Sequence, residues 1–173
     1  MRSRPREDNV ERTGETSIPR WPLVIPRIYV GIVFLAAGVG QLTASTDWTA
    51  GGQSWPQALH VQLTTWLAHS AVWYRPFITH FLLPRTDIIA PALGWIHVLL
   101  GIALIAGIGT RLAAAIVAVL LLNYAAAAGD ALYGAAEPSA YLALVIAVWL
   151  GRAGRTWGVD AILARRQPEM VLG

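Results

Sequence analysis

Two polar side chains interrupt long apolar runs of this chain and are the first candidates for chemistry. His97 lies inside the apolar run 88–108, and Asn123 lies inside the run 112–128. If both runs are membrane helices that rise about 1.5 Å per residue, the two side chains lie near mid-membrane and can meet between antiparallel neighbours. An imidazole and a carboxamide at that depth could hold the carbonyl of a quinone and relay its protons. Three further side chains are expected to complete such a pocket: Tyr124, Trp95 and Gln41.

The same two residues have a structural alternative, a hydrogen bond that only holds the two helices together. The sequence contains no Walker loop, no dinucleotide-binding glycine fingerprint, no paired catalytic carboxylates and no Ser-His-Asp arrangement. A self-contained hydrolase or nucleotide enzyme is therefore not expected, and the catalytic residues, if the protein has any, stay unknown at this level.

The chain has no cysteine, which excludes disulfides, thiol redox chemistry, thiolate zinc sites, Cys-ligated iron–sulfur clusters and thioether-bound haem. His97 is the one histidine inside an apolar run, so a haem held by two intramembrane histidines is not expected. The spacings of His60, His69 and His80 match no recognised metal motif. We therefore predict no metal and no covalently bound cofactor, with a diffusible quinone as the candidate cofactor.

The composition indicates a membrane protein, because 55% of the residues are hydrophobic and 13% are charged, against about 25% charged residues in soluble domains. Four apolar runs predict the transmembrane helices: 23–42, 88–108, 112–128 and 138–151. The expected fold is an all-α membrane protein, a four-transmembrane-helix bundle whose membrane domain extends over residues 23–166. A signal peptide is the alternative interpretation of the first run.

The segment 43–87 is rich in aromatic residues and connects the first two predicted spans. Four of its apolar residues share one helical face: Leu59, Leu63, Trp66 and Leu67. This spacing predicts amphipathic helices that lie on the outer membrane surface as a cap. Residues 1–22 are highly charged and predict a disordered cytoplasmic tail, and residues 167–173 form a C-terminal tail.

The thirteen basic residues are all Arg, and eleven of them fall on one side of the predicted bundle. Arg75 and Arg85, in the loop 43–87, are the two exceptions. The positive-inside rule therefore places both termini in the cytoplasm and predicts a multi-pass protein of the cell (inner) membrane. No nucleic-acid-binding motif accompanies the net charge of +3, so we expect membrane lipids and not nucleic acid as partners.

Three stretches resemble the DoxX/DoxD family of small four-helix membrane proteins. They are RIYVGIVFLAAG at 27–38, GIALIAGIGTRLA at 101–113 and GRTWGVD at 154–160. The resemblance implies an integral subunit similar to the small subunit of thiosulfate:quinone oxidoreductase, which passes electrons from thiosulfate to membrane quinone. It also implies a partner subunit or a homo-oligomer. One departure is His97, because the family usually has a glutamate at that position.

Arg27, Arg111 and Asp160 fall in these family-like stretches and at the cytoplasmic face of the predicted bundle. We expect a structural ion-pair cluster that holds the C-terminal segment on the helix ends, with binding of a sulfur oxyanion as the alternative. The function expected first is an integral membrane subunit of a quinone-linked redox complex. The alternatives are a non-catalytic membrane anchor or assembly factor and a small-molecule permease.

Overall fold

The computed structural model describes residues 21–43, 54–129, 138–151 and 159–160. In chain order the elements are the 3₁₀ turn Trp21–Leu23, α1 Val24–Thr43, α2 Trp55–Leu67, α3 Arg75–Phe77, the π-helical segment Ile78–Leu82, the 3₁₀ turn Leu83–Arg85, α4 Thr86–Ala106, α5 Thr110–Ala128 and α6 Pro138–Leu150. All of these elements are helical, so the all-α prediction is confirmed for this part of the chain. The predicted tail 167–173 and residues 1–20 of the predicted tail 1–22 lie outside the described residues.

Three helices are long and apolar enough to cross a membrane: Val24–Thr43, the continuous stretch Arg75–Ala106 and Thr110–Ala128. Helix α6 has 13 residues and is shorter than a usual span. At the standard rise it extends about 20 Å, against roughly 30 Å for the hydrocarbon core of a bilayer. The prediction of a membrane-spanning helical protein is therefore supported, with three helices of sufficient length among the described residues.

Helices α1 and α4 pack against each other through glycines that recur every seven residues on each helix. Gly31 and Gly38 lie on α1, and Gly94 and Gly101 lie on α4. A Cβ atom built at Gly38 would lie 2.6 Å from the backbone nitrogen of Val98, which is far closer than real contacts allow. The two backbones therefore touch, as is typical of close helix packing in lipid.

The core at the end of the bundle that is remote from α2 lies between α1, α4, α5 and α6. Its buried members are Val30, Phe34, Leu100, Leu104, Ala113, Ala114, Val117, Leu121, Val145 and Val148. Many apolar side chains on the opposite helix faces are exposed, among them Ile88 at 72% and Leu112 at 69%. Such faces suit contact with lipid rather than water.

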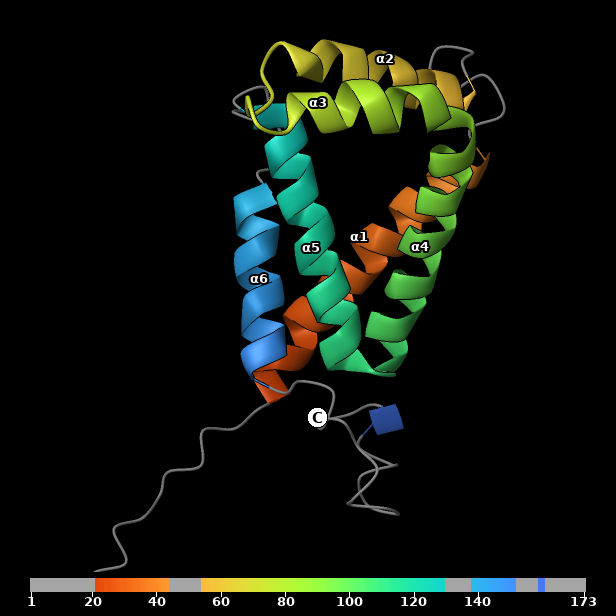
Figure 1. Ribbon diagram of the computed structural model, residues 1–173. Helices are drawn as coiled ribbons and strands as arrows, with labels where there is room; N and C mark the ends of the chain where they lie inside the picture. Colours follow the sequence, from red (N-terminus) through yellow and green to blue (C-terminus); the bar gives the residue numbers. More distant parts are fainter. Residues whose placement is uncertain (1–20, 44–53, 130–137, 152–158, 161–173) are drawn as a thin grey trace, which may run out of the picture.

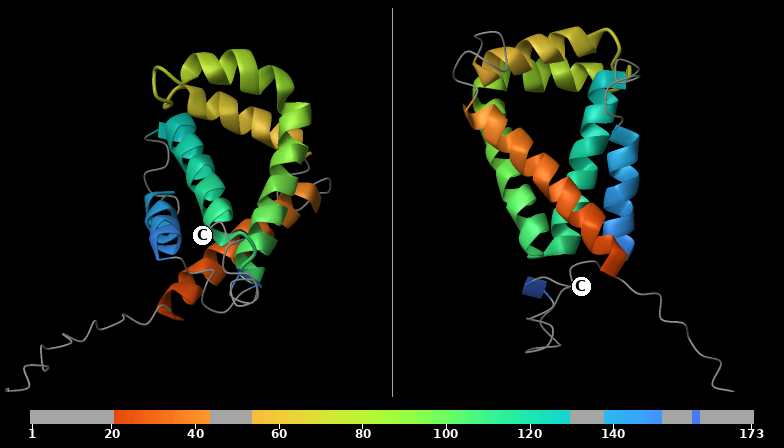
Figure 2. Two further views of the ribbon diagram at one scale, coloured as in Figure 1. Left: turned by 60° about the horizontal axis from the view of Figure 1, so that its bottom comes forward. Right: turned by 180° about the vertical axis from the view of Figure 1, so that it is seen from behind.

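Helices α4 and α5 join through a tight turn in which Gly107 and Gly109 have positive φ angles of 70° and 54°. These conformations are accessible to glycine at little cost, which explains how two helices can follow each other so closely. From this turn α4 and α5 diverge toward the opposite end of the molecule (Figure 1). Helix α1 crosses behind them, and α6 lies beside α5 (Figures 1 and 2).

Residues 54–85, which we call the cap, lie across the separated ends of α4 and α5 (Figure 1). Leu59 and Leu63 lie on the face of α2 that the sequence predicts to be apolar. They are buried on the inner side of the cap, in one cluster with Tyr74 and Ile78. The indole of Trp55 donates a 2.9 Å hydrogen bond to the carbonyl of Ala90 in α4. The α2–α3 turn is also attached to α5, because the amide of Ala71 donates a 3.1 Å hydrogen bond to the carbonyl of Ala126.

Candidate functional site

A cavity of about 220 Å³ lies beneath the cap, between α4 and α5. Its lining comes from the cap (Leu59, Leu63, Trp66, Tyr74, Phe77 and Leu82), from α4 (Ile89 and Leu93) and from α5 (Leu120, Asn123, Tyr124 and Ala127). Most of this lining is apolar or aromatic, with a few polar groups from Tyr74, Asn123 and Tyr124. Ligand sites in proteins commonly combine such a surface with a few well-placed polar groups.

Asn123 receives its partner from the cap rather than from α4. The hydroxyl of Tyr74 donates a 2.6 Å hydrogen bond to Oδ1 of Asn123. The amide nitrogen of Asn123 donates to the carbonyl of Val119 at 2.9 Å. Because an amide nitrogen carries two hydrogens, Asn123 retains one more donor for a ligand. The direct His97–Asn123 hydrogen bond that the sequence suggested is not among the contacts of the described residues.

His97 is 4% exposed and does not line the cavity, whereas Tyr124, which contacts it, does. Its Nδ1 lies 2.8 Å from the carbonyl oxygen of Leu93, one turn earlier in α4. Because a carbonyl only accepts, we assign the proton of the neutral ring to Nδ1, which leaves Nε2 as an acceptor. The hydroxyl of Tyr124 lies 3.4 Å from Nε2 and can donate to it in this tautomer.

The site therefore consists of two polar contacts on neighbouring residues of α5. Tyr74 bonds to Asn123 at the cap, and Tyr124 contacts His97 in the interior. The ring of Trp66, from α2, meets the ring of Tyr124 edge-on with centroids 6.3 Å apart. This arrangement could hold a flat ring with a polar oxygen, and it connects that oxygen to a buried imidazole through one hydroxyl.

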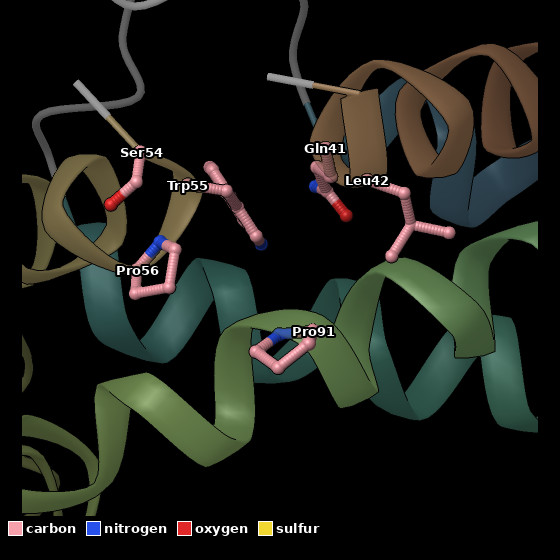
Figure 3. Close-up of a pocket in the computed structure, with 6 residues that line it drawn as sticks. All are labelled: Gln41, Leu42, Ser54, Trp55, Pro56 and Pro91. Carbon is pink, nitrogen blue, oxygen red and sulfur yellow. The ribbon is translucent and has the colours of Figure 1, made fainter. Parts of the chain in front are cut away.

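Two of the predicted pocket residues lie elsewhere. Trp95 is 58% exposed on the outer face of α4, so it does not line this cavity. Gln41 lines a separate, smaller cavity of about 140 Å³ with Leu42, Ser54, Trp55, Pro56 and Pro91. In Figure 3 the amide of Gln41 and the indole of Trp55 face the same space, with Pro91 below. Oε1 of Gln41 is buried there and has no hydrogen-bond partner among the described residues.

Tyr74 and Phe77 are cavity residues that sequence reasoning missed. Both lie in the aromatic-rich loop, where aromatic residues are usually explained by a preference for the headgroup region. Tyr74 is separated from Asn123 by 49 positions, and no periodicity relates the two. The sequence indicates only that Asn123, within an apolar run, needs a hydrogen-bond partner. It does not indicate which residue supplies that partner.

The predicted cytoplasmic cluster of Arg27, Arg111 and Asp160 divides into two contacts. The carboxylate of Asp160 accepts hydrogen bonds from the backbone amides of Gly109 (2.8 Å) and Thr110 (3.0 Å), so it caps the N-terminus of α5. Asp160 also interacts electrostatically with Arg27, which is 2% exposed.

Arg111 is not paired with Asp160 in any contact of the described residues and stacks over the ring of Trp149 at 5.3 Å instead. The sequence led us to expect one ion-pair cluster, whereas the described contacts join Asp160 to Arg27 and Arg111 to Trp149. Arg111 connects α5 to α6 through a cation–π contact, which needs no carboxylate.

Within the described ranges no group of three or more His, Cys, Asp and Glu side chains is arranged to hold a metal ion. No curated protein and no solved structure matches the chain. The DoxX family model matches residues 74–130, the segment that extends from Tyr74 through α4 and α5 and contains most of the cavity lining, and this match supports membership in the DoxX family.

Proposed function

We propose that this protein is a DoxX-family membrane subunit that binds a quinone ring in the cavity beneath the cap and works in a quinone-linked redox complex. The observation that carries the proposal is the pair of polar contacts on Asn123 and Tyr124 in an otherwise apolar cavity. The family match includes most of the residues that line this cavity but names no ligand. The thiosulfate:quinone type of complex follows from the sequence resemblance described above.

The residues of the cavity fit a quinone in size and chemistry. A volume of about 220 Å³ is smaller than the roughly 300–1,000 Å³ of pockets for drug-sized ligands, so it suits a single ring. The apolar lining matches the ring, and the free amide hydrogen of Asn123 can donate to a ring carbonyl. Tyr74 keeps Asn123 in place by occupying its oxygen.

His97 and Tyr124 would supply a proton to the bound oxygen. While the imidazole is neutral, the Tyr124 hydroxyl donates to Nε2 of His97. When His97 is protonated, Nε2 becomes a donor and the Tyr124 hydroxyl can turn its hydrogen toward the cavity. Tyr124 lines the cavity and His97 does not, so the proton would pass from the imidazole through the phenol.

A quinone bound in this cavity would take up two electrons and two protons and leave as a quinol. The sequence has no cysteine, and the part of the chain that the structure describes contains no metal-binding group. We therefore propose that a partner subunit delivers the electrons, with thiosulfate as their source.

The membrane topology is part of the same proposal. We place α6 as a fourth span because it is apolar and lies beside α5, with Val145 and Val148 buried in the core. Its short length suits a locally thinner bilayer. The distribution of Arg supports an inner-membrane protein with both termini in the cytoplasm, which places the cap on the outer side.

The test compares two leucine substitutions of amides, one in each cavity. The protein is purified in mild detergent, and co-purifying quinone is quantified by mass spectrometry in the wild type, Asn123→Leu and Gln41→Leu. We expect stoichiometric quinone in the wild type and in Gln41→Leu, and its loss in Asn123→Leu, because the two variants differ in the cavity they alter.

Absence of quinone from all three proteins, even after incubation with added quinone, would contradict the proposal. A non-catalytic anchor that holds a partner in the membrane would then be the better explanation. Equal retention in all three proteins would show that quinone binds outside this cavity.

A further inference from the structure

Phe77 belongs both to the cavity and to the outer surface of the protein. Among the residues that line the cavity, Phe77 is the most exposed, at 40%. Its ring lies 5.2 Å from the ring of Tyr74, the residue bonded to Asn123. The Phe77 side chain is therefore the wall between the polar end of the cavity and the surroundings of the protein.

A second exposed aromatic ring adjoins Phe77 at the surface. Phe77 stacks on Phe81 with ring centroids 5.0 Å apart, and Phe81 is itself 46% exposed. The guanidinium of Arg85 lies over the Phe81 ring at 4.9 Å. A change from exposed aromatic rings to a cation is typical of the boundary between hydrocarbon and headgroups. This pattern favours contact of the Phe77 ring with the bilayer rather than with open water.

The backbone near Phe77 has two features that would favour an entrance to the cavity. Helices α4 and α5 diverge toward the cap, and α1, which crosses behind them, contributes no residue to the cavity lining (Figures 1 and 2). A π-helical segment, Ile78–Leu82, begins directly after Phe77. Such wide turns are rare and frequent at functional sites.

We propose that Phe77 closes a lateral entrance from the bilayer and that the ligand is a membrane-dissolved amphiphile with a ring and an apolar tail. The cavity has room for the ring alone, so the tail of a bound molecule lies beside Phe77 and extends into lipid. This inference rests on the proposed quinone site and adds to it that the physiological ligand carries a tail, with Phe77 as the residue that selects for it.

The test uses two probes, a methoxy-substituted benzoquinone headgroup without a side chain and the same headgroup with a decyl chain. Their affinities for the full-length protein in lipid nanodiscs are measured by quenching of tryptophan fluorescence, to which Trp66 in the cavity contributes. The variants are Phe77→Trp, which fills the space beside the ring, and Phe81→Trp as the matched control. Phe81 is also exposed and aromatic but does not line the cavity.

We expect Phe77→Trp to weaken binding of the decyl probe by about tenfold or more, because the tail and the larger ring compete for one space. The same variant should change the affinity of the tailless probe by less than about twofold, because only the tail lies beside Phe77. Phe81→Trp should bind both probes like the wild type.

Equal weakening of both probes by Phe77→Trp, or no weakening of either, overturns the lateral entrance and leaves the quinone site intact. The same weakening in Phe81→Trp also overturns it, because Phe81 lies outside the cavity. If the wild type binds neither probe, the proposed function itself fails, and the inference that rests on it fails too.

Discussion

Tyr74 of the cap donates a 2.6 Å hydrogen bond to Oδ1 of Asn123 in α5, and both residues line the same cavity. One contact therefore attaches the cap to the bundle and orients the polar group of the candidate site. A motion that lifted Tyr74 would remove the donor from Oδ1 of Asn123, while the amide nitrogen would keep its bond to Val119.

Replacing Tyr74 with phenylalanine should lower the free energy of unfolding by about 1–2 kcal/mol, because the Asn123 oxygen loses its donor in a largely apolar cavity. The measurement is unfolding of the detergent-solubilised protein by added denaturing detergent, followed by tryptophan fluorescence. A double-mutant cycle with Asn123→Leu provides the control. The two losses should be non-additive by roughly 0.5 kcal/mol or more, whereas full additivity would show that the bond contributes nothing.

The hydrogen bond between Tyr74 and Asn123 also predicts that the stability of the fold decreases at alkaline pH. Burial raises the pKa of Tyr74 above its usual value of 10.0. Because the folded-state pKa is the higher one, the neutral phenol stabilises the fold fully below the unfolded-state pKa, and this contribution is lost as pH rises through the folded-state pKa. Absorbance near 295 nm should show a late-ionising tyrosine that is missing in Tyr74→Phe. Identical titration curves for the two proteins would contradict this prediction.

The part of the site on the helices could be predicted from sequence because polar residues inside apolar runs are conspicuous. His97, Asn123 and Tyr124 were found in this way, and the structure brings all three to one region. The depth of a residue in the membrane, however, does not tell which face of its helix the side chain lies on. Trp95 lies only two positions from His97, yet it points outward, and Gln41 lies in the smaller cavity between α1, α4 and the start of α2.

The cap residues that line the cavity could not be predicted, because their place depends on tertiary contacts and not on the periodic spacing of apolar residues. The spacing of Leu59 and Leu63 predicts an amphipathic helix, and both side chains are buried in α2. Nothing in the spacing of Tyr74 or Phe77 relates them to α5. Arg111 was assigned to a carboxylate because opposite charges are the usual partners, but its guanidinium lies over the ring of Trp149 in α6 instead.

Asp160 should stabilise the turn between α4 and α5 more than its position near the end of the chain suggests. Its two oxygens accept from Gly109 and Thr110, and its charge acts on the buried Arg27. We expect Asp160→Asn to cost about 1–2 kcal/mol of unfolding free energy. Asp87→Asn, an exposed carboxylate in the first turn of α4, is the matched control and should cost well under about 1 kcal/mol. Equal losses would show that Asp160 acts only as a general negative charge.

Two glycines of α1, Gly38 and Gly40, test whether the backbones of α1 and α4 are in contact. A Cβ atom at Gly38 would lie 2.6 Å from the nitrogen of Val98 and 2.8 Å from the oxygen of Gly94, whereas a Cβ atom at Gly40 would meet nothing within 4 Å. Gly38→Ala should therefore push the helices apart and lower the unfolding free energy by about 1–3 kcal/mol.

Gly40→Ala, the control for this experiment, should leave the stability unchanged or raise it by up to about 1 kcal/mol, because alanine is the better helix former. Denaturing-detergent titrations of the two variants give the comparison directly. If Gly38→Ala is as stable as Gly40→Ala, the backbones of α1 and α4 do not touch at this position. Since α4 carries both His97 and part of the cavity wall, a true separation should also weaken binding in the cavity, which the quinone assay described above would detect.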